Sequence, residues 1–271
     1  MASNRFSLAA VFLAYFLVAG GIALALILLV KAGARGDGAF YGAVALGGAV
    51  GGAAAARARR GSTIIEPAIG GLLVIGTLVG IFIGTQAGSV LWHVGKDQIL
   101  RAIAIAGALA AAGAIVGAVA AEKLAGGHST SPLAWLLFVA FAMLGACLVS
   151  TVVAVAFFFH GTSDDSKLGG IVFGAMAVGA FVTGLTTGAS APRRILLVNL
   201  VGVVAGVMGY YLLVRALPNA ADDKDAGAAA LGFAIIGVAG GLVAMAGAAI
   251  GWRAVGKRNA LDAEVTSRAF A

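Results

Sequence analysis

Two polar side chains stand inside otherwise apolar segments, and their chemistry could support ion binding. Glu66 follows the residues GSTII and opens a long apolar run. Asn199 lies in the later run ILLVNLVGVV, close to the position that corresponds to Glu66 in a second copy of the same pattern. A carboxylate is costly to bury in a membrane and usually marks an ion path or has a partner. An amide at a similar depth can bind a ligand or bridge two helices.

The sequence leaves two interpretations of Glu66 open. In the first, its carboxylate couples to ion or proton movement, and Glu66 and Asn199 face each other across the axis between two halves of the chain as one binding site. In the second, Glu66 is a first-turn residue that the positive end of its helix stabilises. Pro67 follows it directly, and proline is tolerated early in a helix. The carboxylate could then also turn back toward Arg59 or Arg60.

Clusters of arginine precede both runs. Three arginines lead into the first and two into the second, namely Arg57, Arg59, Arg60, Arg193 and Arg194. Lys and Arg at the cytoplasmic ends of membrane helices fix their orientation. They also attract anionic lipid headgroups, by about 1 kcal/mol each. We therefore predict topology anchors, with a dedicated lipid or anion site as the alternative.

Other residues offer little chemistry. The three histidines, His93, His128 and His160, are too scattered for a metal-ligand pattern. The chain lacks the motifs of serine hydrolases, zinc proteases, P-loop proteins and paired-cysteine sites. The single cysteine, Cys147, falls in an apolar run and is expected to be a packing residue. The sequence therefore predicts no enzyme, no cofactor and no metal site.

The elements that must position these residues are membrane helices. Of the 271 residues, 61% are hydrophobic and 11% are charged, whereas a soluble domain carries about 25% charged residues. So few charges could not cover a surface that faces water, and lipid is the solvent that suits the chain. The net charge of +7 is therefore interpreted by its distribution across the membrane, and nucleic acid is not an expected partner.

Eight segments approach the length of about 20 apolar residues that a helix needs to cross a bilayer. The second is the shortest of them. The first is interpreted as a retained helix, because its apolar run is longer than that of a signal peptide. The predicted spans are Leu8–Val30, Ala39–Ala56, Ile64–Gly84, Ala102–Ala121, Leu133–Phe159, Leu168–Thr187, Ile195–Leu213 and Ala226–Gly251.

Eight spans place both termini on one side of the membrane. That side then carries eleven of the 18 lysine and arginine residues, including all five in the clusters. The excess of positive charge assigns this side to the cytoplasm. The many Ala and Gly residues are typical of bacteria rich in GC, so we expect a multi-pass protein of a bacterial inner membrane with both termini cytoplasmic.

The chain also repeats itself. The segment YGAVALGGAVGG (residues 41–52) aligns with FGAMAVGAFVTG (residues 173–184) at an offset of 132, which also relates Gly70 to Gly202. The first helices align at an offset of 125, Leu8 over Leu133, and the last helices at an offset of 130. This predicts a four-helix unit in residues 1–126, a second in 127–258 and a cytoplasmic tail in 259–271. Because each unit has an even number of spans, the second unit would start on the same side of the membrane as the first, and the two repeats would be parallel.

These observations predict an all-α, polytopic transmembrane helix bundle of about eight spans, built as two parallel four-helix repeats. Two functions remain. The repeat favours a permease or channel for an ion or small solute, lined between the halves. The scarcity of polar residues favours the alternative, a non-catalytic membrane subunit that scaffolds or anchors a larger complex. The expected partners are the lipid bilayer, anionic headgroups, and further copies of the chain or a larger membrane complex.

Overall fold

The computed structural model describes residues 7–34, 36–58, 64–83, 86–125, 131–159, 165–191, 195–215 and 226–256. Within these ranges the chain is helical, without strands, and the predicted all-α class is confirmed. The helices are α1 (Leu8–Lys31), α2 (Asp37–Ala58), α3 (Ile65–Ile83), α4 (Gln86–Ala125), α5 (Pro132–Phe159), α6 (Asp165–Ser190), α7 (Leu196–Arg215) and α8 (Ala226–Gly251). A short π-helical turn, Trp252–Gly256, follows α8.

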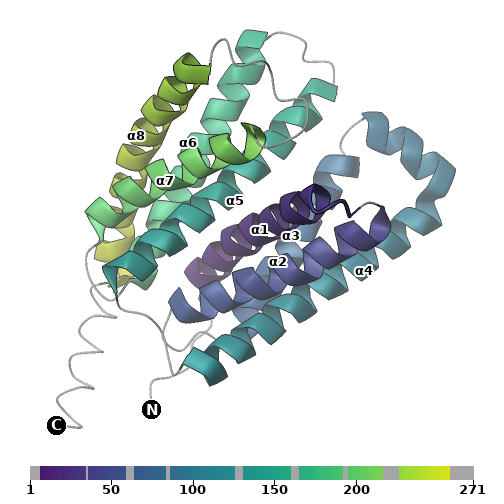
Figure 1. Ribbon diagram of the computed structural model, residues 1–271, viewed down its shortest axis with the longest axis horizontal. Helices are drawn as coiled ribbons and strands as arrows, with labels where there is room; N and C mark the ends of the chain where they lie inside the picture. The colour runs from purple at the N-terminus through teal and green to yellow at the C-terminus, as the bar shows by residue number, and fades with distance from the viewer. Residues whose placement is uncertain are drawn as a thin grey trace.

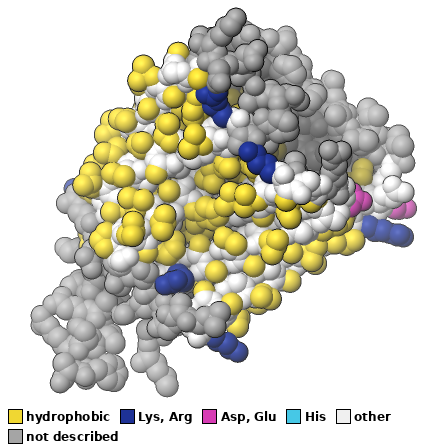
Figure 2. Space-filling view, viewed as in Figure 1, with side chains coloured by type: hydrophobic (Ala, Val, Ile, Leu, Met, Phe, Trp, Pro, Cys, Tyr) yellow, Lys and Arg dark blue, Asp and Glu magenta, His cyan; other side chains and the backbone are white. Residues whose placement is uncertain are grey.

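Seven of the described helices are long and apolar enough to cross a membrane. The apolar part of α3, Ile65–Gly80, is shorter than those of the other seven. Hydrophobic side chains cover the middle of the face shown in Figure 2, and the described Lys and Arg side chains lie toward its ends. Among the exposed side chains are Leu72, Leu137, Leu197 and Leu242, each at least half exposed. The protein is therefore a multi-pass membrane protein whose apolar surface contacts lipid.

The largest difference from the predicted spans concerns α4. The sequence predicts a helix over Ala102–Ala121, whereas α4 starts at Gln86 and bends at Gly95, where φ is −144° and ψ is 35°. Gly95 is not helical, so two helical segments meet here, and polar residues such as Lys96 and Asp97 interrupt the apolar run. Hydropathy follows the apolar part of a helix and misses an extension in which polar residues interrupt the apolar run.

Helices that are neighbours in one half are matched by neighbours in the other. In the first half α1 packs on α2 and α3, and α4 packs on α2 and α3. In the second half α5 packs on α6 and α7, and α8 packs on α6 and α7. The halves meet mainly where α1 packs on α5 and α6, and α1 and α5 lie next to each other in the middle of Figure 1. α1 begins and α8 ends at the same end of the bundle (Figure 1).

Glycines let the helices approach each other backbone to backbone, and these contacts recur in both halves. A Cβ added at Gly52 of α2 would overlap the carbonyl of Ala114 in α4. A Cβ added at Gly184 of α6 would overlap the carbonyl of Ala244 in α8. The two α2 and α6 positions differ by 132 residues and the two α4 and α8 positions by 130, which are the offsets of the sequence repeat.

A short turn brings α2 directly back against α1. Gly33 follows the end of α1 with φ of +87°, a left-handed conformation that glycine adopts without strain. The Ala34 N–H donates to the Leu29 carbonyl oxygen at 2.9 Å, which satisfies a carbonyl of the last helical turn. This pattern is a Schellman motif, and Gly36 provides a second positive φ of 76° before α2 begins.

Candidate functional site

Glu66 lies in the first turn of α3 and is only 1% exposed. Its Oε1 accepts a hydrogen bond from the Ser7 N–H, at 3.2 Å, where α1 begins. The positive ends of the α1 and α3 dipoles both favour a carboxylate at this position. This position fits the first-turn interpretation of Glu66, and a role in ion coupling stays a prediction. Arg59 and Arg60 lie outside the described residues.

Asn199, near the start of α7, is fully buried. Its Oδ1 accepts a hydrogen bond from the Thr187 hydroxyl at 2.7 Å, and its Nδ2 donates to the Ile195 carbonyl oxygen at 3.1 Å. The amide therefore bridges α6 and α7 within the second half. Glu66, by contrast, is bonded to the start of α1. The prediction that Glu66 and Asn199 together form one site stays a prediction.

Four buried hydroxyl residues share one side of α6 near its end. We call this set the hydroxyl face: Thr183, Thr186, Thr187 and Ser190, each no more than 8% exposed. Spacings of three and four residues place them on one side of a helix. The Thr187 hydroxyl lies 2.8 Å from the Thr183 carbonyl oxygen and 3.0 Å from that of Gly184. The Thr183 and Ser190 hydroxyls find no hydrogen-bond partner among the described residues.

α6, which carries the hydroxyl face on one side, is one of the two helices of the second half that pack most on α1 of the first half. The opposite side of α6 packs on α8 through Gly184 and Gly188, where an added Cβ would overlap α8 carbonyls. Earlier in α6, Met176 and Ala180 continue the line of the hydroxyl face. They belong to the hydrophobic cluster that includes Leu17 of α1 and several residues of α5. The hydroxyl face thus lies on a helix that contributes to the core shared by the two halves, and Asn199 of α7 is bonded to it.

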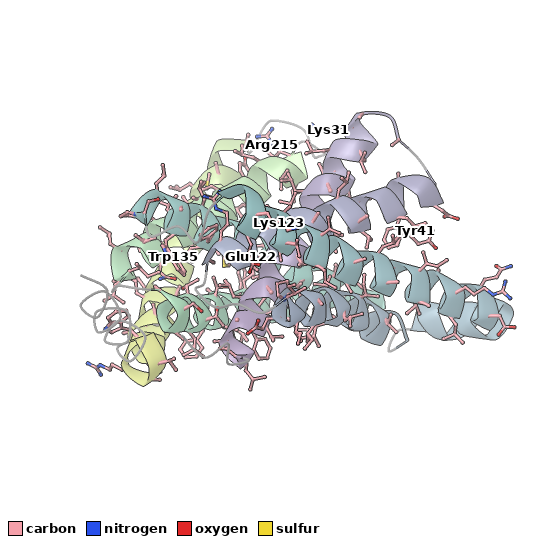
Figure 3. All side chains as sticks on the ribbon, turned by 90° about the horizontal axis from the view of Figure 1, so that it is seen from below. Lys31, Tyr41, Glu122, Lys123, Trp135 and Arg215 are labelled. Atoms are coloured by element: carbon pink, nitrogen blue, oxygen red, sulfur yellow. The ribbon has the colours of Figure 1, made fainter. Side chains whose placement is uncertain are left out.

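Trp135, in the first turn of α5, adds a third buried polar group without a partner among the described residues. Its ring is 1% exposed and packs edge-to-face on Phe138, with the ring centroids 5.8 Å apart. The Ser131 hydroxyl caps α5 by accepting a hydrogen bond from the Ala134 N–H at 3.1 Å. In Figure 3, Trp135 lies away from Lys31 and Arg215, which end α1 and α7.

Of the five predicted arginine anchors, the structure describes one. Arg57 is exposed in the last turn of α2. A basic side chain there suits the negative end of the helix dipole. Arg59, Arg60, Arg193 and Arg194 lie outside the described residues, as does the predicted tail, residues 259–271.

The sequence reasoning singled out Asn199 and missed the hydroxyl face beside it. The signal was the segment TGLTTGAS, residues 183–190, in which hydroxyl residues recur at helical spacing. Threonine and serine in membrane helices commonly bond to their own backbone, so their presence alone is a weak sign of a site. What distinguishes these residues is burial with two hydroxyls that find no partner in the part of the chain that the structure describes, and only the folded chain reveals this.

Comparison of the chain with protein-family models, with curated proteins and with solved structures found no match.

Proposed function

We propose that this multi-pass membrane protein is a permease or channel, not an enzyme, and that it moves an ion or small polar solute along a path between its two halves. The observation that carries the proposal is the hydroxyl face of α6 together with Asn199. These polar groups are buried where α7 meets α6, a helix that also packs on the first half, in a chain that is otherwise strongly apolar. Buried polar side chains in membrane proteins commonly line substrate or ion paths.

The contact between α1 and α5 supports a plan of two related halves. A Cβ added at Gly20 would lie 2.7 Å from the Phe141 carbonyl oxygen, and a Cβ added at Gly145 would overlap that of Phe16. Both pairs of equivalent residues, Phe16 with Phe141 and Gly20 with Gly145, differ by 125 residues. A two-fold axis produces this kind of reciprocal contact. Parallel repeats related by an axis along the membrane normal are one of the plans of secondary transporters, which bind substrate between the repeats.

The proposed membrane is a bacterial inner membrane, and the proposed orientation has both termini in the cytoplasm. The common end of α1 and α8 supports a shared side for the termini. Arg57 ends α2 on that side, where the positive-inside rule expects arginine and where anionic lipid headgroups would meet it.

Flux through the purified protein tests the proposal. The full chain would be reconstituted into liposomes and assayed for uptake of labelled monovalent cations, protons, amino acids and sugars, with empty liposomes as the control. Saturable uptake of at least one of these classes is the expected result. Thr187→Val should lower that uptake at least tenfold while the protein still elutes as a single species in detergent. Uptake no faster than in empty liposomes for every class would overturn the proposal.

One observation favours the alternative, a membrane subunit that scaffolds or anchors a larger complex. The helices within each half approach so closely that an added Cβ at Gly52, Gly117, Gly184 or Gly247 would overlap the backbone of the neighbouring helix. Such packing suits a rigid anchor as well as a transporter. Purification from native membranes in mild detergent separates the two functions. A stoichiometric partner chain favours the scaffold, and a protein that purifies alone or as a homo-oligomer favours the permease.

A further inference from the structure

We propose that the hydroxyl face of α6 and Asn199 bind one small monovalent cation, for which Na⁺ is the probe. This proposal adds a ligand to the proposed function, because the cation would lie beside the path between the halves. Any role of the cation in transport rests on that proposed function. Binding itself can be measured whether or not the protein transports anything.

Several oxygen atoms lie close together around Thr187. Its hydroxyl carries one proton but has three acceptor oxygens within 3.0 Å: the carbonyl oxygens of Thr183 and Gly184 and the Oδ1 of Asn199. The two carbonyl oxygens also accept main-chain N–H groups of the helix, and the Oδ1 of Asn199 is the nearest acceptor for the Thr187 proton; each of these oxygens has two lone pairs. A cation beside these oxygens would interact favourably with each of them.

Two further hydroxyls lack partners in the same region. Thr183 lies one turn before Thr187, and Ser190 lies about one turn after it. Neither hydroxyl has a hydrogen-bond partner among the described residues, although both side chains are more than nine-tenths buried. A buried hydroxyl that makes no hydrogen bond costs free energy, and a bound ligand would recover it. The Thr183 hydroxyl is thus the first candidate for an additional ligand oxygen.

The charge and hardness of these groups select the ligand. All of them are neutral oxygen donors, which suit hard cations and not the softer transition metals. The side chains of the site carry no negative charge, so they compensate a single positive charge better than a double one. The site also lies in the last two turns of α6, whose C-terminal carbonyls form the negative end of the helix dipole. Helix C-terminal ends and backbone carbonyls hold Na⁺ in other membrane transporters.

The first half supplies an internal control for this chemistry. At the offset of 132, the hydroxyl face corresponds to Gly51, Ala54, Ala55 and Ala58 of α2. The corresponding helix of the first half therefore forms without hydroxyls at these positions, although its Gly51 packs on the backbone of α1. The substitution Thr187→Ala should therefore remove a ligand oxygen without preventing folding.

The experiment measures the thermal unfolding of the purified full-length protein in detergent. The protein is prepared in choline chloride, and Na⁺ or K⁺ replaces choline at constant ionic strength. We expect the midpoint of unfolding to rise and saturate with at least one of the two ions, because a ligand that binds only the folded state stabilises it. Identical unfolding in all three salts would overturn the proposal.

Substitutions at the site test where the cation binds. Thr187→Ala should raise the cation concentration that gives half of the effect by at least tenfold, and Thr187→Ser should restore it. Asn199→Asp adds a negative charge and should lower that concentration by about tenfold. Ser150→Ala is the matched control, because Ser150 is 3% exposed and its hydroxyl donates to the Ala146 carbonyl of its own helix. A Thr187→Ala protein that titrates like the wild type would equally overturn the proposal.

The binding and flux measurements fail independently. If the protein binds a cation saturably but shows no flux, the cation site is supported and the permease function is contradicted. The opposite outcome is flux that is equal in choline, Na⁺ and K⁺, together with an unfolding midpoint that neither Na⁺ nor K⁺ changes. This outcome would support the permease and contradict the cation site.

Discussion

The ends of α2 and α6 have equivalent places in the two halves but opposite chemistry. Both helices pack closely on the last helix of their half through glycines at equivalent positions, Gly52 and Gly184. The other side of α2 presents Gly51, Ala54, Ala55 and Ala58, whereas the same side of α6 presents the hydroxyl face. The close glycine contact thus occurs at the end of both helices, whereas the buried hydroxyls lie on α6 and not on α2. On α2 this side includes Gly51, where an added Cβ would overlap the backbone of α1, so that position could not carry the threonine found on α6.

Glu66, the buried acid of the first half, also differs from its counterpart in the second half, Asn199. Glu66 ties the start of α3 to the start of α1, and Asn199 ties the start of α7 to the end of α6. Each half therefore places one polar residue near the start of its third helix. In the first half that residue accepts a hydrogen bond at the start of α1. In the second it joins a group of buried hydroxyls, which makes the second half the better place for a ligand.

The largest expected effect tests the close glycine contact that both halves share. Gly52→Val and Gly184→Val should each cost about 3 kcal/mol or more, because the new side chain overlaps the backbone of α4 or α8 and the helices must separate. Gly76→Val is the matched control, since an added Cβ at Gly76 meets nothing within 4 Å. Unfolding in detergent, followed by circular dichroism, measures the loss. A large loss for one of the two variants alone would break the equivalence of the halves.

Glu66 should give the next largest effect. Glu66→Ala removes a buried side chain and leaves the Ser7 N–H without its acceptor, so we expect a loss of about 2–3 kcal/mol in the free energy of unfolding. Glu66→Gln retains an acceptor oxygen and should cost about 1 kcal/mol. Glu122→Gln, at an exposed position in the last turns of α4, is the control and should change stability by less than about 0.5 kcal/mol. Equal stability of the wild type and Glu66→Ala would remove the structural role given to this acid.

A double-mutant cycle measures the polar link in the second half. Thr187→Ala and Asn199→Ala, made singly and together in buffer that contains choline only, should show a coupling of about 1 kcal/mol, the contribution of one hydrogen bond. The matching cycle in the first half, Ala55→Gly with Glu66→Ala, should show less than half of this coupling. Coupling of equal size in both halves would contradict the asymmetry.

Arg57 should give the smallest effect on stability. The side chain is exposed, so Arg57→Gln should change the free energy of unfolding by less than about 0.5 kcal/mol. Its effect should appear instead in nanodiscs, where stabilisation by anionic over zwitterionic lipid should fall by up to about 1 kcal/mol. Unchanged lipid preference would leave Arg57 as an anchor of orientation without a contribution to lipid binding.

The sequence predicted most of the helices because burial in lipid demands long apolar runs. The bounds of α8 agree with the prediction, and even α2, which is built largely of Ala and Gly, is a helix of 22 residues. The early part of α4 was missed because its polar residues break the apolar run. Hydropathy therefore locates the part of each helix in hydrocarbon, and it is silent on helical extensions beyond it.

The candidate site was less predictable than the fold. The depth of Asn199 follows from its place in an apolar run, but its partner Thr187 depends on how α6 and α7 pack. The offset of 125 relates Gly20 to Gly145, yet it does not say that these two glycines meet each other. Contacts between helices depend on rotation about each helix axis. A sequence of small apolar residues on every side leaves that rotation undetermined.

The contact of Gly20 with Gly145 also sets an order of events during synthesis. The two glycines are separated by 125 residues, so α1 enters the membrane long before its partner on α5 exists. At about 5–20 residues per second, the ribosome needs roughly 6–25 s to make the intervening chain. During this interval the first four helices can pack on one another, while the α5-facing side of α1 has only lipid or another nascent chain as its neighbour. The protein therefore passes through a stage in which pairing with another copy competes with pairing within the chain.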